Sequence, residues 1–358
     1  MELLKKLRIP SYKTLLRYAR ALGFGDIDTR MDNASGLHAI IAIHNTKLGP
    51  ALGGCRFYEY DRPELALEDA LRLAYGMTLK AAACGVAHGG AKAVIIKPRH
   101  LTDRKAIFRA FGDFIQSLNG RYITAVDVGT TLDDMTTIFE RTAFVVGAKG
   151  PGRIDDDPSP FTAKGVFFAI RAAVKFHYQR DNCEGMRAAI QGVGRVGFNL
   201  AKYLVEDGAH VTVFDTNAES LKHAVKMLDV KTVNPDQIES LPCDIFSPCA
   251  MGGTISLDMI QHCKAKIIAG AANNQLAHHS NAHIMRDRGI LYLPDFLINA
   301  GGLIYAASTY AHQDIAKAHE KIQHIYEVTL NLLERAAKTH QTTVEVAEMI
   351  AFEKLGMV

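Results

Sequence analysis

The sequence predicts an α/β protein built from two domains. The chain has 358 residues, more than a single hydrophobic core usually organises, so two domains are the first expectation. Apolar runs of strand length alternate with segments of helical period, which is typical of parallel or mixed sheets covered by crossover helices. Near 147–160 the composition changes to GAKGPGRIDDDPSP, and clustered proline and glycine without periodicity indicate a connection between domains.

The overall composition excludes several classes of protein. Hydrophobic residues make up 48% of the chain, enough for two cores and too many for a disordered protein. Lys and Arg number 41 against 38 Asp and Glu, which gives no reason to expect a nucleic-acid partner. No apolar run reaches the ~20 residues that a membrane helix needs. The six cysteines are scattered, so we expect free thiols and a cytoplasmic location.

The first 22 residues are basic and amphipathic, with several leucines available for burial. A transit peptide or a helix lying on a membrane surface would have this composition. Glu2 and Pro10 fit a transit peptide poorly. We therefore favour a helix that packs within the protein or against another subunit.

The first half of the chain carries the first group of candidate site residues. Expected strands cover 37–44, 56–60, 92–97 and 121–128, and expected helices cover 63–83, 103–117 and 132–141. In the first of these helices, Leu67 and Leu71 belong to an apolar stripe at helical spacing. Lys80 continues that stripe, so we expect its side chain to face inward.

Lys80, Lys92 and Asp127 lie in glycine-rich, otherwise apolar segments. Burial of a lysine among apolar residues lowers its pKa toward neutrality and lets it act as a base. A lysine that keeps a carboxylate partner instead stays charged and binds anions. The pattern indicates that the two lysines divide these roles, with the acid moving a proton between them and a substrate.

A glycine motif follows an expected strand over 186–191, and it precedes an expected helix over 198–207 and a strand over 210–214. In this context Gly192-Val-Gly194-Arg-Val-Gly197 indicates a dinucleotide-binding fold of the Rossmann type. Gly192 would permit the tight turn, Gly194 the close approach of a pyrophosphate, and Gly197 the packing of helix on strand. The N-terminus of the helix would bind the phosphates.

Asp215 ends the second strand of this motif, where it can accept hydrogen bonds from ribose hydroxyls. Its charge would repel a 2′-phosphate, and no arginine follows in Thr216-Asn217-Ala218. NAD is therefore favoured over NADP. Together with the two lysines and the acid, the motif indicates hydride transfer on a small amino or keto acid.

The rest of the chain continues the alternation. Expected strands cover 244–246, 266–271 and 290–293, an expected helix covers 281–289, and a helical tail begins near 316. Asn273, Asn274 and Asn299 follow strand ends, where open α/β sheets bind ligands. The tail is long enough to cross back and pack on the first domain.

Three other patterns indicate weaker alternatives. The histidines at 278, 279 and 283 lie in a polar loop, and we expect surface histidines rather than a metal site. The acids at 155–157 are expected to be solvated loop charge. Cys243 and Cys249 match no zinc spacing, so no metal is expected.

Several blocks of the sequence carry a more specific signal because they occur together and in a fixed order. They are LGPALGG (48–54), EDALRLAYGMTLKAA (68–82), GGAK (89–92), DVGTT (127–131), DPSPFTAKGV (157–166), QGVGRVG (191–197), AGAANNQLA (269–277) and INAGG (298–302). In these blocks the chain resembles the glutamate/leucine/phenylalanine/valine dehydrogenase family, and its leucine dehydrogenases in particular. The resemblance extends from about residue 36 to residue 345.

The resemblance implies roles for individual residues. Lys80 resembles the lysine that binds the substrate α-carboxylate, Lys92 the catalytic lysine, and Asp127 the residue that exchanges a proton with the substrate amine. The implied reaction is NAD-dependent oxidative deamination through an imino acid, to which water activated by Lys92 adds. Further residues resemble the family's substrate-binding set, namely Leu52, Gly53, Ala125, Asn274, Leu303 and Ala306. The implied cofactor-binding set is Thr162, Gly192, Val193, Gly194, Arg195, Val196, Gly197, Phe198, Asp215, Asn273 and Asn299.

The family organisation implies two domains with the active-site cleft between them. Residues 1–147, joined by C-terminal helices at about 325–358, would bind substrate and form the homo-oligomer. Residues 148–324 would form the Rossmann-type NAD-binding domain. Amino acid, 2-oxo acid and ammonia are then the expected small-molecule partners.

The implied side-chain pocket contains no charged residue. A branched aliphatic substrate is therefore favoured, and glutamate is disfavoured because its γ-carboxylate would be buried unpaired. Three departures from the family pattern are Ala81, Ala91 beside the catalytic lysine, and Tyr305 near the pocket. They leave two alternatives open: the same chemistry on phenylalanine or another apolar amino acid, or a catalytically weakened NAD-binding sensor or biosynthetic partner.

Overall fold

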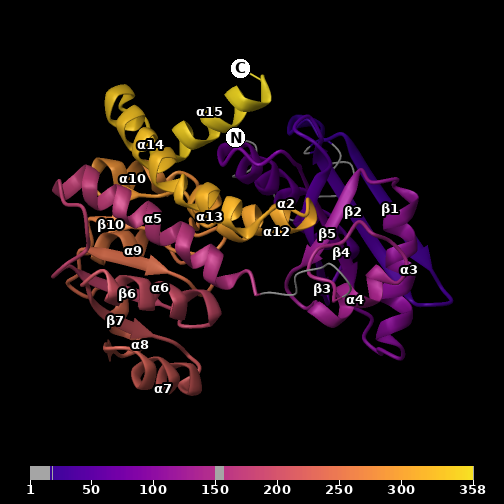
Figure 1. Ribbon diagram of the computed structural model, residues 1–358, viewed down its shortest axis with the longest axis horizontal. Helices are drawn as coiled ribbons and strands as arrows, with labels where there is room; N and C mark the ends of the chain where they lie inside the picture. Colours follow the sequence, from indigo (N-terminus) through magenta and orange to yellow (C-terminus); the bar gives the residue numbers. More distant parts are fainter. Residues whose placement is uncertain (1–16, 18, 150–156, 358) are drawn as a thin grey trace. The chain divides into compact units, whose positions relative to one another are not determined.

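The structure is a computed structural model that describes residues 17, 19–149 and 157–357 (Figure 1). The chain divides into two compact units, Met1–Asp156 with Thr309–His312, and Asp157–Ser308 with Gln313–Val358. Each unit contains a β-sheet covered by helices. The prediction of an α/β protein with two domains is confirmed.

The first unit is built on a five-stranded mixed sheet with the order β1-β2-β4-β3-β5. Its strands are β1 (Asp26–Asp32), β2 (Leu37–Asn45), β3 (Ala51–Tyr58), β4 (Gly89–Ile96) and β5 (Tyr122–Val126). β1, β2 and β4 pair antiparallel, whereas β4, β3 and β5 pair parallel. The carboxyl ends of the three parallel strands therefore lie at one edge of the sheet.

Helices cover both faces of this sheet. They are α2 (Pro63–Ala83), α3 (Arg104–Ser117) and α4 (Leu132–Phe139). On β4, Ala91 and Ile95 pack in one buried cluster with Phe108 of α3, while Val94 packs in another with Leu71 of α2. Because successive side chains of a strand point to opposite faces, Lys92 lies on the α2 face.

The sequence does not predict β1, which lies at the edge of the sheet and pairs with β2. Its residues DIDTRMD are exposed or half-buried, and Met31 keeps 68% of its accessible surface. A strand with so little burial lacks the apolar alternation by which strands are recognised.

The second unit is built on a six-stranded sheet with the order β11-β10-β9-β6-β7-β8, and all its pairs are parallel. Its strands are β6 (Arg187–Gln191), β7 (His210–Phe214), β8 (Val230–Thr232), β9 (Ile245–Pro248), β10 (Ile267–Ile268) and β11 (Leu291–Tyr292). The strand order reverses between β6 and β9, which is the topological switch point where doubly wound sheets bind dinucleotides.

The helices of the second half of the chain pack around this sheet (Figure 1). They are α5 (Ser159–Tyr178), α6 (Arg195–Glu206), α7 (Ala218–Met227), α8 (Pro235–Ile238), α9 (Leu257–His262), α10 (Asn281–Asp287), α11 (Asp295–Ile298), α12 (Gly301–Tyr310), α13 (Ile315–Gln323), α14 (Ile325–Thr339) and α15 (Thr343–Leu355).

The C-terminal helices correct one expectation. The family resemblance implies that the helices at about 325–358 join the first domain, but the structure groups α14 and α15 with the second unit. Leu332 and Leu333 of α14 are buried there, and the Ile325 side chain approaches Gly165 of α5. The apolar stripe of α14 therefore packs against α5.

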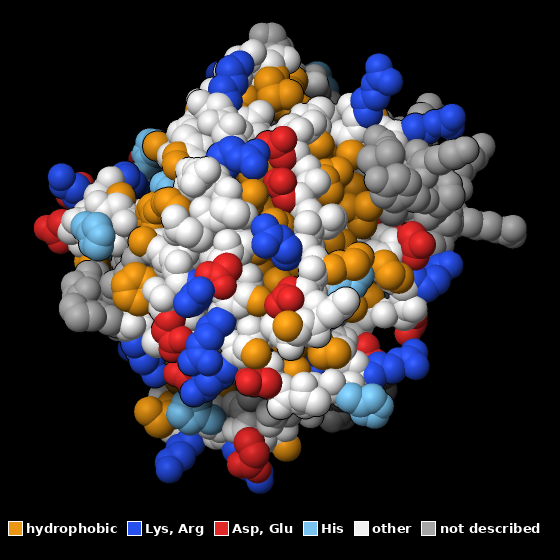
Figure 2. Space-filling view, turned by 90° about the vertical axis from the view of Figure 1, so that its right-hand side faces the viewer, with side chains coloured by type: hydrophobic (Ala, Val, Ile, Leu, Met, Phe, Trp, Pro, Cys, Tyr) orange, Lys and Arg blue, Asp and Glu red, His pale blue; other side chains and the backbone are white. Residues whose placement is uncertain are grey.

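Some expectations lie outside the described residues, including most of the basic N-terminal segment and the acids at 155 and 156. In the ranges that the structure describes, no helix has the length and apolar character to cross a membrane. Basic and acidic side chains are interspersed on the face drawn in Figure 2, as the near balance of charge suggests.

Candidate active site

Lys92 and Asp127 form an ion pair in the first unit. Lys92 Nζ lies 2.9 Å from Asp127 Oδ2, and the two side chains keep 7% and 20% of their accessible surface. Lys92 lies in β4, and Asp127 directly follows β5. The sequence leaves open whether this lysine lies among apolar residues alone or has a carboxylate partner. The structure shows the carboxylate partner.

A tight turn sets the position of Asp127. The Thr130 side-chain oxygen accepts from the Asp127 amide at 2.8 Å and lies 3.0 Å from the Cys55 carbonyl oxygen. Gly129 has φ +80°, and a Cβ there would lie 1.9 Å from the Phe57 carbonyl oxygen. The DVGTT block is therefore the sequence of a turn that only glycine can complete at this distance from β3.

Burial by itself would raise the pKa of Asp127. The opposite charges of Lys92 and Arg56, with their hydrogen bonds, outweigh that effect and bring the pKa below its ordinary value. The carboxylate is therefore ionised at neutral pH and can receive a proton.

Close backbone contacts bring α2 against β4. A Cβ on Gly90 would lie 2.1 Å from the Thr78 nitrogen, and one on Gly53 would lie 1.7 Å from the Ala91 carbonyl oxygen. These glycines let β3, β4 and α2 approach closely. The contact at Thr78 places the last turn of α2, which carries the half-buried Lys80, over the beginning of the strand that carries Lys92.

The three departures from the family pattern are buried side chains. Ala91 is fully buried in the cluster on the α3 face, so its methyl group points away from Lys92. Ala81 is buried in α2. Tyr305 is buried in the second unit, with its ring stacked on Phe161 at 3.9 Å between centroids.

The predicted side-chain pocket residues lie on elements of both units. Leu52 and Gly53 are buried in β3, and Ala125 pairs with Gly54 across β5 and β3. Leu303 and Ala306 lie three residues apart in α12, so they share a face of that helix.

The glycine motif of the second unit forms a strand–turn–helix junction. Gly192 has φ +97°, and a Cβ on Gly197 would lie 1.9 Å from the Gly192 carbonyl oxygen. Gly194 is the N-cap of α6, and a Cβ built there meets no atom within 4 Å. The helix begins at Arg195 rather than at the expected residue 198, so Arg195, Val196, Gly197 and Phe198 form its first turn. The first amides of a helix have no partner within it and can bind a phosphate.

Asp215 braces this junction. Its Oδ2 accepts from the Val193 amide at 2.7 Å, and its Oδ1 accepts from the Asn217 amide at 2.8 Å. Each oxygen keeps a second lone pair. The sequence predicts a ribose contact for Asp215. The structure shows in addition that this carboxylate binds two backbone amides of the junction.

Three asparagines lie outside the helices and strands of the same unit. Asn299 is 4% exposed, and its Nδ2 donates to Ala271 O at 3.0 Å and to Asn273 Oδ1 at 2.8 Å. Its Oδ1 is buried without a hydrogen-bond donor among the described residues. Asn274 has φ +54° and donates its amide to Asp295.

Thr162 lies in the first turn of α5 and donates to Pro158 O at 3.2 Å. A Cβ on Gly302 would lie 2.5 Å from Thr162 Oγ1. The glycines of the INAGG block therefore let α12 approach the start of α5.

Comparison with known proteins identifies the family. Residues 24–144 match the model described as Glu/Leu/Phe/Val dehydrogenase, dimerisation domain. Residues 156–219 and 215–357 match the model described as Glutamate/Leucine/Phenylalanine/Valine dehydrogenase. The chain belongs to the Glu/Leu/Phe/Val dehydrogenase family. The predicted family is thus confirmed, and the protein is an amino-acid dehydrogenase.

Individual relatives resemble the chain over nearly its whole length. A leucine dehydrogenase of Bacillus cereus is 44% identical over 342 residues, which cover 96% of this chain and 93% of the relative. An L-tryptophan dehydrogenase of Nostoc punctiforme is 42% identical over 322 residues, covering 89% of this chain and 90% of the relative. The crystal structure of L-tryptophan dehydrogenase from Nostoc punctiforme superposes with a TM-score of 0.84 at 39% identity, covering 95% of this chain and 98% of the other.

Arg56 is a member of the site in this dehydrogenase that the sequence analysis does not single out. Its Nε lies 3.1 Å from Asp127 Oδ2, and its Nη1 lies 2.5 Å from Asp69 Oδ2. An arginine inside the largely buried strand ALGGCRFY is a usable signal, because a charge in such a strand needs a partner.

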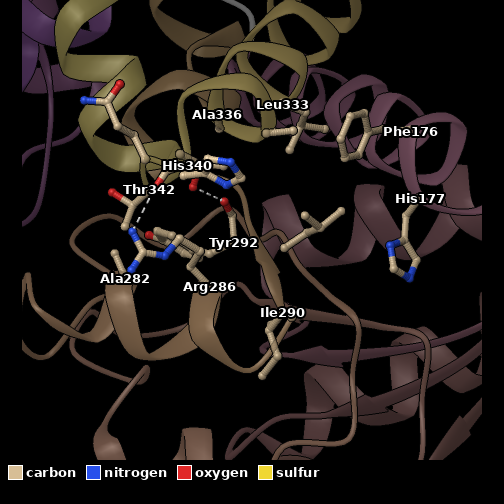
Figure 3. Close-up of a pocket in the computed structure, with 15 residues that line it drawn as sticks. Phe176, His177, Ala282, Arg286, Ile290, Tyr292, Leu333, Ala336, His340 and Thr342 are labelled. Carbon is tan, nitrogen blue, oxygen red and sulfur yellow. Dashed lines mark hydrogen bonds between the residues drawn. The ribbon is translucent and has the colours of Figure 1, made fainter.

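A separate cavity of about 340 Å³ lies between α5, α10, α14 and the start of α15 in this dehydrogenase (Figure 3). Phe176, Leu333 and Ala336 line it, and Arg286 donates to the His340 carbonyl at its rim. None of the predicted site residues lines this cavity.

The histidines considered as metal ligands have carboxylates nearby. His279 lies 3.4 Å from Glu348, and His283 lies 3.9 Å from Glu345. In the part of the chain that the structure describes, no group of three His, Cys, Asp or Glu residues is arranged to hold a metal ion.

Proposed function

We propose that this enzyme oxidatively deaminates leucine, valine and isoleucine to the corresponding 2-oxo acids and ammonia, reversibly and with NAD as the hydride acceptor. The observation that carries the proposal is the buried Lys92–Asp127 pair beside the helix end that bears Lys80. The leucine dehydrogenase relatives at 44% identity support the choice of substrate. In this proposal the first unit binds the amino acid and the second binds the dinucleotide.

The residues of the first unit would act in sequence. Lys80 binds the α-carboxylate as a charged ammonium, while Asp127 takes a proton from the substrate ammonium and leaves a neutral amine. Bound NAD supplies the acceptor for the hydride that leaves the α-carbon, so the substrate becomes an imino acid.

Once Asp127 is protonated, Lys92 no longer faces a carboxylate and gives its ammonium proton to solvent. The neutral Lys92 then removes a proton from water, and the resulting hydroxide adds to the imine carbon. Asp127 returns its proton to the nitrogen. The hydroxyl group of the carbinolamine then loses its proton to solvent, and the carbon–nitrogen bond breaks as the carbonyl forms and neutral ammonia leaves. Lys92, charged at this stage, stabilises the negative charge that develops on the substrate oxygen. The overall change consumes one water and releases one ammonia.

The second unit has features that fit a dinucleotide. The open space above Gly194 and the first amides of α6 suit a pyrophosphate. The buried, unsatisfied Oδ1 of Asn299 suits an amide donor such as a carboxamide. Thr162, Asn273 and Asn274 are assigned to the same cofactor and substrate surface by their family positions.

The apolar character of Leu52, Ala125, Leu303 and Ala306 supports an aliphatic substrate. A second candidate is the same chemistry on an aromatic amino acid. It is favoured by the L-tryptophan dehydrogenase relative and by a phenylalanine dehydrogenase of Lysinibacillus sphaericus, each 42% identical to this chain.

A substrate panel tests the proposal. NAD reduction at 340 nm would be followed with leucine, valine, isoleucine, phenylalanine, tryptophan and glutamate, with kcat/KM measured for each. The highest kcat/KM is expected for the branched aliphatic substrates, and glutamate is expected to be inert because its second carboxylate would be buried unpaired. A preference for phenylalanine or tryptophan would favour the second candidate. Binding of NAD without turnover of any member would favour a sensor.

Replacement of Asp215 by alanine should weaken NAD binding and relax its preference over NADP. Loss of a hydrogen bond to a charged group is worth about 1.5–3 kcal/mol, so the Kd for NAD should rise by about ten-fold or more. The repulsion of a 2′-phosphate is removed at the same time. Kd values for NAD and NADP, measured by fluorescence titration, check this, and an unchanged NADP/NAD ratio would contradict the ribose contact.

We also propose that the enzyme is a homo-oligomer assembled through its first unit. The family model matched by residues 24–144 is described as a dimerisation domain, which supports this assignment. In the described structure all six cysteines are without a disulfide bond, which supports a reducing compartment such as the cytoplasm.

A further inference from the structure

Arg56 is a charged residue in the middle of a buried strand. Its neighbours Cys55 and Phe57 are buried on the α3 face of the sheet, so the guanidinium lies on the α2 face. The Arg56 side chain keeps 21% of its accessible surface. A cation placed there is stable only with partners, because an unpaired buried charge is costly.

Arg56 joins two carboxylates that belong to different elements. One end of the guanidinium binds Asp69 of α2 at 2.5 Å, and Nε binds Asp127 at 3.1 Å. Asp69 is itself held by the Tyr60 hydroxyl at 2.7 Å and by Arg72 at 3.3 Å. The arginine therefore links the helix to the carboxylate at the end of β5.

Asp127 is held through one of its two oxygens. Oδ2 binds both Lys92 Nζ at 2.9 Å and Arg56 Nε at 3.1 Å. Among the described residues no side chain or amide bonds Oδ1, and a fifth of the Asp127 side chain stays accessible. This arrangement fixes the carboxylate and leaves Oδ1 for a donor from outside the protein.

We propose that Arg56 is a positioning residue for Asp127, which it orients toward the substrate amine and keeps ionised until the carboxylate receives the substrate proton. The inference rests on the role proposed above for Asp127. Lys92 is not a constant partner, because its charge is lost when it acts as a base. The guanidinium of an arginine keeps its charge at every working pH, so Arg56 supplies the constant cation.

The ionisable groups around Asp127 support this assignment. Burial raises the pKa of the Cys55 thiol on β3 and of the Tyr122 phenol on β5, so both are uncharged at neutral pH. The charges that face Asp127 in the described structure are then Lys92 and Arg56, with Asp69 of α2 behind the arginine. Removal of Arg56 should raise the pKa of Asp127. The acid limb of the activity profile, which requires the carboxylate, should move to higher pH.

The first experiment measures kcat and KM for leucine against pH in Arg56→Ala and Arg56→Lys. We expect kcat of Arg56→Ala to fall by about 100-fold, as for a misplaced catalytic group, and its acid limb to move to higher pH. Added guanidinium ion should restore part of the activity. Arg56→Lys should lie between Arg56→Ala and the wild type, because an ammonium keeps the charge but lacks the separate nitrogens with which the guanidinium reaches the two carboxylates. Arg109→Ala is the matched control, since that arginine of the same unit pairs with the exposed Glu140.

The readouts separate positioning from simple structural support. A folded Arg56→Ala protein with wild-type kcat, or with an unmoved acid limb, would overturn the proposal. A lowered kcat that guanidinium rescues, together with unchanged NAD affinity by fluorescence titration, would support it.

A second experiment needs no turnover and so remains decisive if the proposed function is wrong. Urea unfolding of Arg56→Ala, Asp127→Asn and the double variant forms a double-mutant cycle. We expect Arg56→Ala to destabilise the wild type more than it destabilises Asp127→Asn. Because the Asp127 pKa is depressed, its stabilising effect is present at neutral pH and is lost as pH falls through the folded-state pKa. Arg56→Ala should reduce this acid-dependent loss.

The outcomes of the two experiments can be told apart. If no substrate of the panel is turned over by the wild type, the proposed function fails, and the cycle alone then decides whether Arg56 holds Asp127. Additive effects in the cycle would overturn the positioning role whatever the result of the panel.

Discussion

Replacement of Lys92 by alanine is expected to lower kcat by about 1,000-fold, the middle of the range usual for loss of a general acid–base group. The substitution removes the ammonium that lies 2.9 Å from Asp127. It also removes the base that the proposed mechanism uses to activate water. Asp127 should remain ionised, because Arg56 stays 3.1 Å away. Steady-state kinetics with leucine, together with NAD affinity by fluorescence titration, measure the effect.

The affinity for NAD should be nearly unchanged in this variant, since Lys92 and the GVGRVG turn belong to different units. Lys97→Ala is a suitable control, because Lys97 directly follows the same strand and is exposed. That control should keep wild-type kcat. A Lys92→Ala enzyme with near-normal turnover would require the catalytic role of this lysine to be withdrawn.

Two neighbouring glycines of the second unit should respond in opposite ways to alanine. A Cβ on Gly197 would lie 1.9 Å from the Gly192 carbonyl oxygen, and such overpacking costs about 3 kcal/mol. Gly197→Ala should therefore lower the melting temperature strongly. Gly194 has φ −63° and open space around its Cα, so Gly194→Ala should leave stability unchanged or slightly raised.

The affinity for NAD should separate the same two variants. The methyl group of Gly194→Ala would stand where a pyrophosphate approaches the backbone, and the Kd for NAD should rise by at least about ten-fold. Thermal unfolding and fluorescence titration of both variants check this. If Gly194→Ala bound NAD as the wild type does, the assignment of the open space to the cofactor would be wrong.

The sequence predicts elements best where one local pattern decides them. The helix over 63–83 agrees with α2 at both ends, because Pro63 opens it and a single apolar stripe runs to Ala83. The glycine motif identifies the junction of β6 and α6, although the helix begins three residues earlier than expected. Glycines at 194 and 197 obscure that start, since glycine is a poor helix former.

Features that depend on distant partners could not be predicted in the same way. The apolar stripe of α14 indicates that one face of this helix is buried, but it does not indicate that α5 is the element that covers that face. Arg56 and Asp127 are 71 residues apart in the chain and meet because β3 and β5 are neighbours. The sequence points to Asp127 through its glycine-rich surroundings, whereas the arginine that holds it has no such context.

The helix α2 carries both Asp69, which anchors Arg56, and Lys80. These two residues are eleven positions apart, about three full turns, so they project from the same side of one rod. A change in the tilt of α2 would therefore alter both the binding of the substrate carboxylate and the proton transfer at Asp127. Substitutions that change the substrate preference without loss of turnover are therefore expected in β3 and α12. They should leave the orientation of α2 unchanged.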